Sequence, residues 1–459
     1  MTLRHLMIFA WSLWSICALN AQNGALDQYI QQALSSNIAL QEKNLSYEKS
    51  LEALKEAKAL FLPQLALNAR YSVAQGGRTI DFPIGDLLNP VYQNLNTINS
   101  LEQAMHPDYP TIPEYPTLSN EQINFLRPTE QETRLSLVMP VFNTAIIQNQ
   151  RIRENLVAAA EISVTAYQRE LVKEVKVAYF NHAQAVQGVQ IWENALELVE
   201  ENLRTTESLH RNNKVTLDVV YAAKAEVSEV EQQLADAQKQ RNMAQAYFNF
   251  LLNRDYNAVI EMEDSYAVET AWLPLDEARQ RALDQREELQ QMQLYLSTAD
   301  RQIEVQKGAF MPTLNLAVDY GIQGTNYKLD KDADYFMGSL VFQWNLFNRA
   351  DKARVQQSKI EQLELSKQLE MLQQQIALQT TNAWYEMEAA QKRITQGQQE
   401  VEAAEQAFRL LQKKFSQGQA NLIEFTNART QLTNAQLSLS LAQFGLQQKM
   451  AILDWAVGE

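Results

Sequence analysis

The stretch "LFLPQLALNARYSV", Leu60–Val73, alternates apolar and polar side chains from Pro63 onward. Every second residue there is apolar or small: Leu65, Leu67, Ala69, Tyr71 and Val73. This two-residue period is typical of a strand with one apolar and one polar face. Most of the remaining chain predicts very long helices. The question is therefore why a mainly helical protein has a few strands, and what these strands pack against.

The chain repeats itself. Residues 33–71 match residues 282–320 at an offset of 249, and from about residue 140 to the end the offset is 205. Paired positions include Pro63/Pro312, Leu65/Leu314, Tyr71/Tyr320 and Phe142/Phe347. The strand pattern P-x-L-x-L-x-x-x-Y arises by chance less readily than a match between helices rich in Ala, Leu and Gln. We therefore predict one structural unit written twice, 22–254 and 281–459, joined by a linker or side element at 255–280.

Each unit predicts the order helix, strand, loop, strand, long helix, turn and return helix. The predicted strands are 62–74, 133–142, 312–321 and 335–347. The predicted long helices are 146–211 and 350–415, interrupted only by Gly188 and Gly397, and the return helices are 217–252 and 422–455. Apolar or small residues spaced by three and four mark a coiled-coil seam on each return helix. A helix of 66 residues is roughly 99 Å long, more than a compact globule needs.

The first unit contains an insertion, residues 76–128, that the second lacks. It holds seven of the 11 prolines. Proline removes a helix hydrogen bond and clashes with the preceding turn, so we predict a long irregular loop rather than a long helix. Loops of this length are usually functional or disordered, and we expect an extracellular lid or plug.

The N-terminus predicts export. Arg4 and His5 precede an apolar run of about 14 residues, "LMIFAWSLWSICAL", which is too short to span a bilayer and fits a signal peptide over residues 1–21. A buried N-terminal helix is the alternative. Cys17 is the only cysteine, and Ile16 before it is larger than a lipoprotein signal needs, so we do not expect lipidation. Without Cys17 no disulfide or cysteine-based metal site is possible.

The strands have the length and alternation of outer-membrane strands. About ten residues cross such a membrane at a tilt, and aromatic residues lie near the strand ends: Phe61, Tyr71, Phe310, Tyr320, Phe342 and Trp344. Four strands cannot close a barrel, and an open edge is costly in lipid, so further copies of the chain must complete it. Two small hairpins packed on soluble helices, in a periplasmic coiled-coil adaptor or scaffold, remain the alternative.

The sequence offers no enzyme chemistry. The four histidines, His5, His106, His182 and His210, make no metal spacing. The sequence has no Walker motif or other Gly-rich phosphate loop, and no G-x-S-x-G nucleophile motif. The net charge of −15 includes no basic stripe for nucleic acid. We therefore expect no enzyme activity, cofactor, metal or nucleic-acid partner, and the energy for any transport must come from another protein.

These features resemble the TolC-like outer-membrane factor family over nearly the whole mature chain, apart from the insertion. The most specific pieces are the paired strand openings, the strand-to-helix joints "MPVFN" and "WNLFN", and the hairpin tips "RNNKVTLDVVYAAKAEV" and "SQGQANLIEFTNARTQL". The resemblance implies a mainly α fold with a small β part. In such a homotrimer, four strands per chain form a 12-stranded barrel in outer-membrane lipid above a 12-helix tunnel in the periplasm.

The resemblance also implies a passive exit duct for efflux or type I secretion, docked to a periplasmic adaptor and an inner-membrane pump. Glu424 falls on the family's first acidic position at the tunnel entrance and Asn427 on the second, while Asp218 lies one place off the family spacing. A negative constriction of this kind favours cations. The alternative for Glu424 is a helix-start carboxylate favoured by the helix dipole. The tips imply docking residues at Asn213, Lys214, Leu217, Gly418, Gln419 and Leu422.

Overall fold

The computed structural model describes residues 24–262, 273–325, 327 and 333–459. The signal peptide, Cys17 and part of the linker at 255–280 lie outside the described residues. The described chain divides into a helical unit and a sheet unit. The helical unit comprises residues 24–57, 148–262, 273–306 and 352–459, and the sheet unit comprises residues 58–147, 307–325, 327 and 333–351. Each unit is considered by itself.

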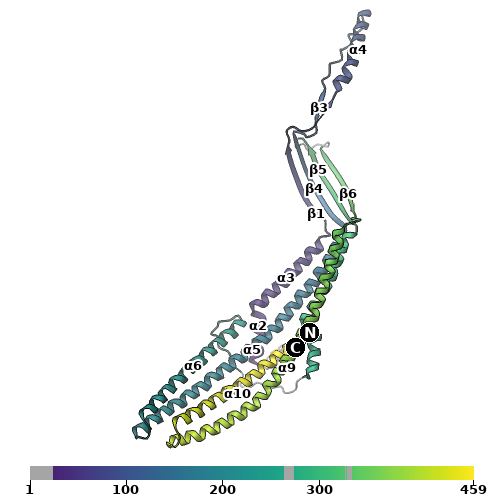
Figure 1. The fold of residues 1–459 in the computed structure, drawn as a ribbon. Coiled ribbons are helices and arrows are strands. Elements are labelled where there is room, and N and C mark those ends of the chain that lie inside the picture. Colours follow the sequence, from purple (N-terminus) through teal and green to yellow (C-terminus); the bar gives the residue numbers. More distant parts are fainter. Residues whose placement is uncertain (1–23, 263–272, 326, 328–332) are drawn as a thin grey trace, which may run out of the picture. The chain divides into compact units, whose positions relative to one another are not determined.

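The helical unit contains two copies of the same arrangement of four helices, which agrees with the predicted internal repeat. Its first copy holds α2 (Ala25–Ser36), α3 (Ile38–Ala59), α5 (Thr144–Arg211) and α6 (Leu217–Leu251). Its second holds α7 (Leu275–Gln285), α8 (Glu287–Lys307), α9 (Arg349–Ser416) and α10 (Leu422–Val457). Both long helices have 68 residues, and their first residues are equivalent positions of the repeat. Figure 1 shows α6 beside α5 and α10 beside α9.

Equivalent residues build the core of each copy. Ala178 and Phe248 belong to the first buried cluster, and their counterparts in the second copy, Ala383 and Leu453, belong to the second. The return helices bury their seam positions, which on α10 include Phe425, Ala428, Leu432, Ala435 and Ala442. This packing confirms the predicted coiled-coil character and the internal repeat, because periodic apolar faces have to be covered by a neighbouring helix.

Each copy also breaks its first helix at the same place. Asn37 separates α2 from α3, and Arg286, at the equivalent position of the second copy, separates α7 from α8. Both have extended backbone angles, with ψ of 125°. The side chain of Asn37 donates to Leu251 O at 3.0 Å, and that of Arg286 donates to Ala456 O at 3.4 Å. Each break therefore ties a short helix pair to the end of the return helix and satisfies a carbonyl that the helix terminus leaves free.

The sheet unit contains a four-stranded antiparallel sheet in the order β1 (Gln64–Val73), β4 (Thr129–Phe142), β5 (Thr313–Gly324) and β6 (Asp334–Gln343). Apolar residues line up across it in one row, Leu67, Leu135, Tyr320 and Phe336. Arg70 faces Glu132 on the opposite side of the same strands. Pro140 interrupts the pairing near the end of β4, where the register with β5 shifts. The short 3-10 helix η1 (Gly308–Phe310) precedes β5.

The proline-rich insertion corrects one expectation. Instead of an irregular loop throughout, it holds a two-stranded sheet, β2 (Thr79–Phe82) with β3 (Glu121–Asn124), and a helix of 22 residues, α4 (Ile84–Met105). Pro83 takes the N-cap of this helix and Pro90 alone lies inside it, while Pro107, Pro110, Pro113 and Pro116 come after its end. Six of the seven prolines therefore lie outside the helix and only Pro90 lies within it, so the proline content of the insertion does not prevent a helix there.

Candidate functional site

Each long helix ends in a tight turn that leads into its return helix, and Figure 1 shows both turns at the same end of the helical unit. Asn213 and Gly418, which are equivalent positions of the repeat, hold the left-handed position of these turns, with φ of 57° and 70°. In both turns the following residue donates its N–H to a carbonyl five positions back, at 2.9 Å. Asparagine therefore does in one turn what glycine does in the other.

The residues predicted for the constriction lie just beyond these turns. Glu424 is the third residue of α10 and forms a capping box with Asn421: Glu424 N–H donates to Asn421 Oδ1 at 2.8 Å, and Asn421 N–H donates to Glu424 Oε2 at 3.2 Å. Asn427 and Asp218 are exposed, on α10 and α6 respectively. The Glu424 carboxylate therefore has a structural task at the helix start, and it also stays exposed at the surface.

The six residues predicted for docking lie in and beside the turns. Five of them are exposed, Asn213, Lys214, Leu217, Gly418 and Gln419. Leu422 is half-buried because it packs against a cluster that contains Phe408, Phe415 and Phe425 from α9 and α10. This cluster holds the second hairpin together close to its turn, so its exposed turn residues are mounted on a packed base.

Three residues that the sequence analysis did not single out join the two return helices. Glu226 on α6 and Arg429 on α10 form an ion pair at 2.9 Å, with side chains only 6% and 5% exposed. Thr426 Oγ1 donates to the second carboxylate oxygen of Glu226 at 2.8 Å. Glu226 lies three residues after the buried Ala223 and four before the buried Val230, which is a seam position. A charged residue inside an apolar seam is the signal that could have drawn attention to it.

A buried histidine lies in α5. His182 is 5% exposed, and its Nδ1 has no hydrogen-bond partner in the described part of the chain. Burial lowers the pKa of His182 below its ordinary value. A hydrogen bond that the ring donates to the backbone carbonyl of Arg241 raises this pKa in part, and the positive charge of Arg241 lowers it. The neutral imidazole is therefore the form that the folded helices accept.

The four-stranded sheet has two chemically different faces. On one, large apolar side chains are exposed, among them Leu65, Leu67, Leu135 and Leu340. On the other, Glu132 pairs with Arg70 and Arg134, each at 3.2 Å, and accepts a hydrogen bond from Tyr335 Oη at 3.1 Å. An apolar face with no described cover and a charged, hydrogen-bonded face are what a lipid-embedded sheet with a wet interior requires.

The aromatic residues predicted for the membrane interfaces belong to this unit. Tyr71, Tyr320, Phe342 and Trp344 are exposed, and Phe61 and Phe310 are half-buried. Trp344 Nε1 donates to Phe310 O at 2.9 Å, which fixes the indole next to the start of β5. Tyrosine and tryptophan present an apolar ring and a polar tip, the combination that suits a boundary between lipid and water.

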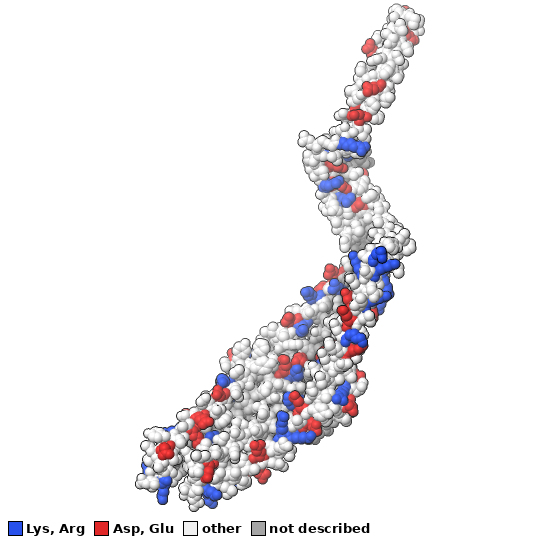
Figure 2. Space-filling view, viewed as in Figure 1, with Lys and Arg blue, Asp and Glu red and all other residues white. Residues whose placement is uncertain are grey.

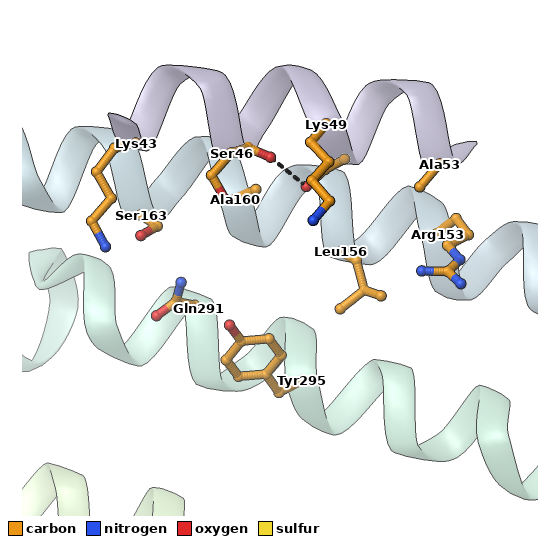
Figure 3. A pocket seen from close by; sticks show the side chains of 11 residues that line it. Lys43, Ser46, Lys49, Ala53, Arg153, Leu156, Ala160, Ser163, Gln291 and Tyr295 are labelled. Carbon is orange, nitrogen blue, oxygen red and sulfur yellow. Dashed lines mark hydrogen bonds between the residues drawn. The ribbon is translucent and has the colours of Figure 1, made fainter. Parts of the chain in front are cut away.

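The helical unit also has a groove of about 420 Å³ between α3, α5 and α8 (Figure 3). Lys43, Lys49 and Arg153 line it, and no carboxylate does. The Ser50 hydroxyl donates to the carbonyl of Ser46 within its own helix at 3.0 Å, so it is not directed at a base. The groove therefore presents a positive wall and no assembled nucleophile.

Among the described residues, no group of three or more His, Cys, Asp or Glu side chains comes together in a way that could hold a metal ion. Within the same part of the chain, none of the helices combines the length and the apolar character needed to cross a bilayer. The features that remain as a functional site are the hairpin turns, the buried pair behind them and the two-faced sheet.

Known proteins share this architecture. The family model described as "Outer membrane efflux protein" matches residues 278–459. Outer membrane protein TolC of Escherichia coli K12 is 21% identical over 436 residues, which cover 91% of this chain and 79% of the relative. The TolC of Salmonella enteritidis is 22% identical over 457 residues, covering 94% of this chain and 82% of the relative. The second copy therefore matches the outer membrane efflux protein family, and nearly the whole chain aligns with the TolC proteins.

Solved structures show the same fold at low sequence identity. The Campylobacter jejuni CmeC outer membrane channel matches with a TM-score of 0.77 at 14% identity, over 95% of this chain and 85% of that one. The outer membrane protein VceC of Vibrio cholerae matches with a TM-score of 0.73 at 17% identity, over 94% and 96%. The outer membrane efflux protein model itself matches only the second copy, and the first copy is connected to it by the internal repeat.

Proposed function

We propose that this outer-membrane efflux channel works as a homotrimer. Three sheets of four strands would close one twelve-stranded barrel in outer-membrane lipid, and the helical units would continue it as a tunnel into the periplasm. The chain is then a passive exit duct for drugs or other exported substrates. Because the sequence carries no nucleotide-binding motif, the energy for export comes from an inner-membrane pump.

The observation that carries the trimer is the unpaired outer edge of the sheet. Among the described strands, β1 pairs only with β4, and β6 only with β5, so each keeps one row of N–H and C=O groups without a partner. In hydrocarbon each unsatisfied group costs several kcal/mol, so open edges are not tolerated there. Pairing β6 of one copy with β1 of the next satisfies both rows, and three copies reach twelve strands, enough for an open lumen.

The faces of the sheet fit this arrangement. The exposed leucines would face lipid, the Arg70–Glu132 pair would face the lumen, and the aromatic residues at the strand ends would border the bilayer. In the helical unit, we propose that the turns around Asn213 and Gly418 receive the tip of a periplasmic adaptor protein. Their exposed side chains, with Lys214, Leu217 and Gln419, provide both charge and apolar contact.

Glu424 is proposed to line the tunnel entrance. Three symmetry-related carboxylates, joined by Asn427 and by Asp218 of the first hairpin, would favour cations and repel anions. Glu424→Gln removes the charge and keeps a side chain that can still complete the capping box. In planar bilayers this variant should lose part of the cation preference, whereas Glu424→Asp should keep it. Unchanged selectivity in Glu424→Gln would remove this residue from the constriction.

The assembly is tested by fractionation and mass. The full chain should be recovered from the outer membrane only with detergent, and light scattering should give a protein mass three times that of one chain. Expression together with candidate adaptor and pump proteins should restore drug export to a host without its own channel. A freely soluble monomer would instead support a periplasmic coiled-coil protein.

A further inference from the structure

Helix α4 carries a seven-residue repeat of apolar side chains. Ile84, Val91, Ile98 and Met105 recur at every seventh position. Leu87, Asn94 and Leu101 follow three residues after the first three of them and recur with the same period. Positions spaced alternately by three and four lie on one face of a helix, so these seven side chains form one stripe, here called the α4 stripe.

The α4 stripe is largely uncovered by the described part of its own chain. Leu87 is 66% exposed, Val91 51%, Ile98 56%, Leu101 57% and Met105 70%. These are large apolar side chains in one continuous row, and such a row on a soluble surface marks an interaction site.

The opposite face of α4 is already occupied by the segment that returns to β3. Asn89 exchanges two hydrogen bonds with the backbone of Leu118, both 2.8 Å, and Asn96 does the same with Tyr115 at 2.8 and 2.9 Å. Gly85 has no room for a Cβ, which would lie 2.4 Å from Leu118 O. These contacts fix the rotation of the helix about its axis, so the α4 stripe faces away from the returning segment and outward.

The chemistry of the stripe favours another α4 as its partner. Isoleucine and valine at one seam position with leucine at the other are features of parallel coiled coils. Asn94 places one polar residue in the leucine row, where pairing with its own counterpart in a sister helix would fix the register. Asp86 and Glu102 are the only charged residues of α4. The face drawn in Figure 2 is accordingly mostly uncharged there, with a few acidic atoms. A helix without Lys or Arg is a poor match for a membrane surface, where amphipathic helices carry basic residues.

The position of α4 in the chain would bring the α4 helices of sister subunits close together. It lies between β1 and β4, neighbouring strands of the sheet that sister copies are proposed to complete. One α4 then emerges per subunit from the same rim, at the high effective concentration that tethering gives. We propose that the α4 helices of sister subunits pack through the α4 stripe into a parallel coiled coil. This inference rests on the proposed trimer.

The number of helices is set by the barrel. Isoleucine or valine at one seam position with leucine at the other suits two strands in free peptides. Leu88 and Leu95 flank the α4 stripe and widen its apolar face, as in helices that contact two neighbours of a bundle. The wider apolar face and the tethering of three copies therefore favour a three-helix coil over the two-helix coil that the seam residues alone would form.

Cysteine cross-linking tests the inference with two adjacent positions. In full-length trimer in detergent, with Cys17 replaced by serine, Leu101→Cys puts a thiol in the stripe, and Ser100→Cys puts one on the face turned away from it. Thiols at equivalent seam positions of a parallel coil come within disulfide reach. Leu101→Cys should give a cross-linked dimer band several-fold stronger than Ser100→Cys under mild oxidation, and adding Ile98→Asp should weaken that band several-fold.

The outcomes separate the two proposals. If light scattering shows no trimer for the parent protein, the proposed assembly fails. If the trimer forms and the two cysteines cross-link equally, or neither does, the coiled coil is overturned while the channel stands. Because α4 lies outside the four-stranded sheet, the mass of each variant shows whether the assembly itself has survived the substitution.

Discussion

Glu226 on α6 and Arg429 on α10 form a buried ion pair, with Nη2 and Oε1 2.9 Å apart. It joins the return helices of the two copies a few turns from their tips. Most of the buried positions next to it are apolar, with Ala223 and Val230 on α6 and Phe425, Ala428 and Leu432 on α10. Two charges held in a nearly dry seam stabilise the contact only while both are present.

Removing one charge should loosen the tips. Glu226→Ala leaves Arg429 buried without its partner, which typically costs about 3–5 kcal/mol. Hydrogen exchange should therefore speed up in the first turns of α6 and α10, while the sheet unit is unaffected. The double variant Glu226→Leu with Arg429→Met should exchange far more slowly than either single variant.

A half-exposed pair on the same hairpin provides the control. Lys224 and Glu207 lie 3.7 Å apart with side chains 53% and 39% exposed. Glu207→Gln should change stability by about 0–1 kcal/mol, because water screens such pairs. Equal effects in Glu207→Gln and Glu226→Ala would contradict a special role for the buried pair.

Two glycines of the sheet should respond oppositely to the same substitution. A Cβ on Gly321 would lie 2.5 Å from Thr133 O, a backbone atom of the neighbouring strand. Gly321→Ala should therefore disrupt the β4–β5 pairing and sharply reduce the yield of folded trimer. A Cβ on Gly338 would meet nothing closer than 3.8 Å, so Gly338→Ala should fold normally. Resistance of the assembly to heating in SDS measures both, and a fully stable Gly321→Ala trimer would refute the close contact.

Substituting glycine or alanine at the positive-φ position of each tip turn should have different effects on hairpin stability. Asn213 and Gly418 have positive φ, which costs most L-residues roughly 1–2 kcal/mol. Asn213→Gly should be neutral or slightly stabilising, whereas Asn213→Ala and Gly418→Ala should destabilise their hairpins by about 1 kcal/mol. Limited proteolysis at the tips reports the difference, and an Asn213→Ala hairpin as resistant as the parent would argue against the left-handed turn.

His182 should make the helical unit sensitive to acid. Its folded pKa is depressed, so the folded state disfavours the protonated ring. Stability is then complete above the unfolded value of about 6.5 and decreases as the pH falls through that value toward the lower folded pKa. The melting temperature should drop between pH 7.5 and 5.5, and His182→Gln should reduce that drop. His106, an exposed histidine outside the helical unit, is the control, and His106→Gln should leave the drop unchanged.

Much of the fold could be predicted because the sequence contains an internal repeat, so each element is indicated by two separate stretches of the chain. The repeat offsets placed both long helices to within two residues of their observed ends, and strict alternation located the four strands. The helix α4 was missed because its prolines were counted over the whole insertion. The positions of the prolines matter more than their number: Pro83 precedes the helix, five prolines follow it, and only Pro90 falls within the heptad pattern.

The buried pair could not be predicted from spacing alone. Glu226 and Arg429 lie 203 residues apart, in helices whose mutual rotation depends on packing. An apolar seam pattern passes over charged residues, and only the three-dimensional contact shows that two of them share one site. Glu424 shows a different limit, because a pattern locates a carboxylate at a helix start without telling whether it caps the helix or also faces a passage.

The equal length of α5 and α9 has a consequence for how such a chain can change over evolution. Deleting one residue from a helix shortens it by about 1.5 Å and rotates everything beyond the deletion by about 100°. A deletion in one copy alone would misalign its hairpin with the other and turn seam residues toward water. Length variants that survive should therefore be paired ones, gaining or losing whole heptads in both halves of the gene together, whereas the insertion that holds α4 is free to grow or shrink by itself.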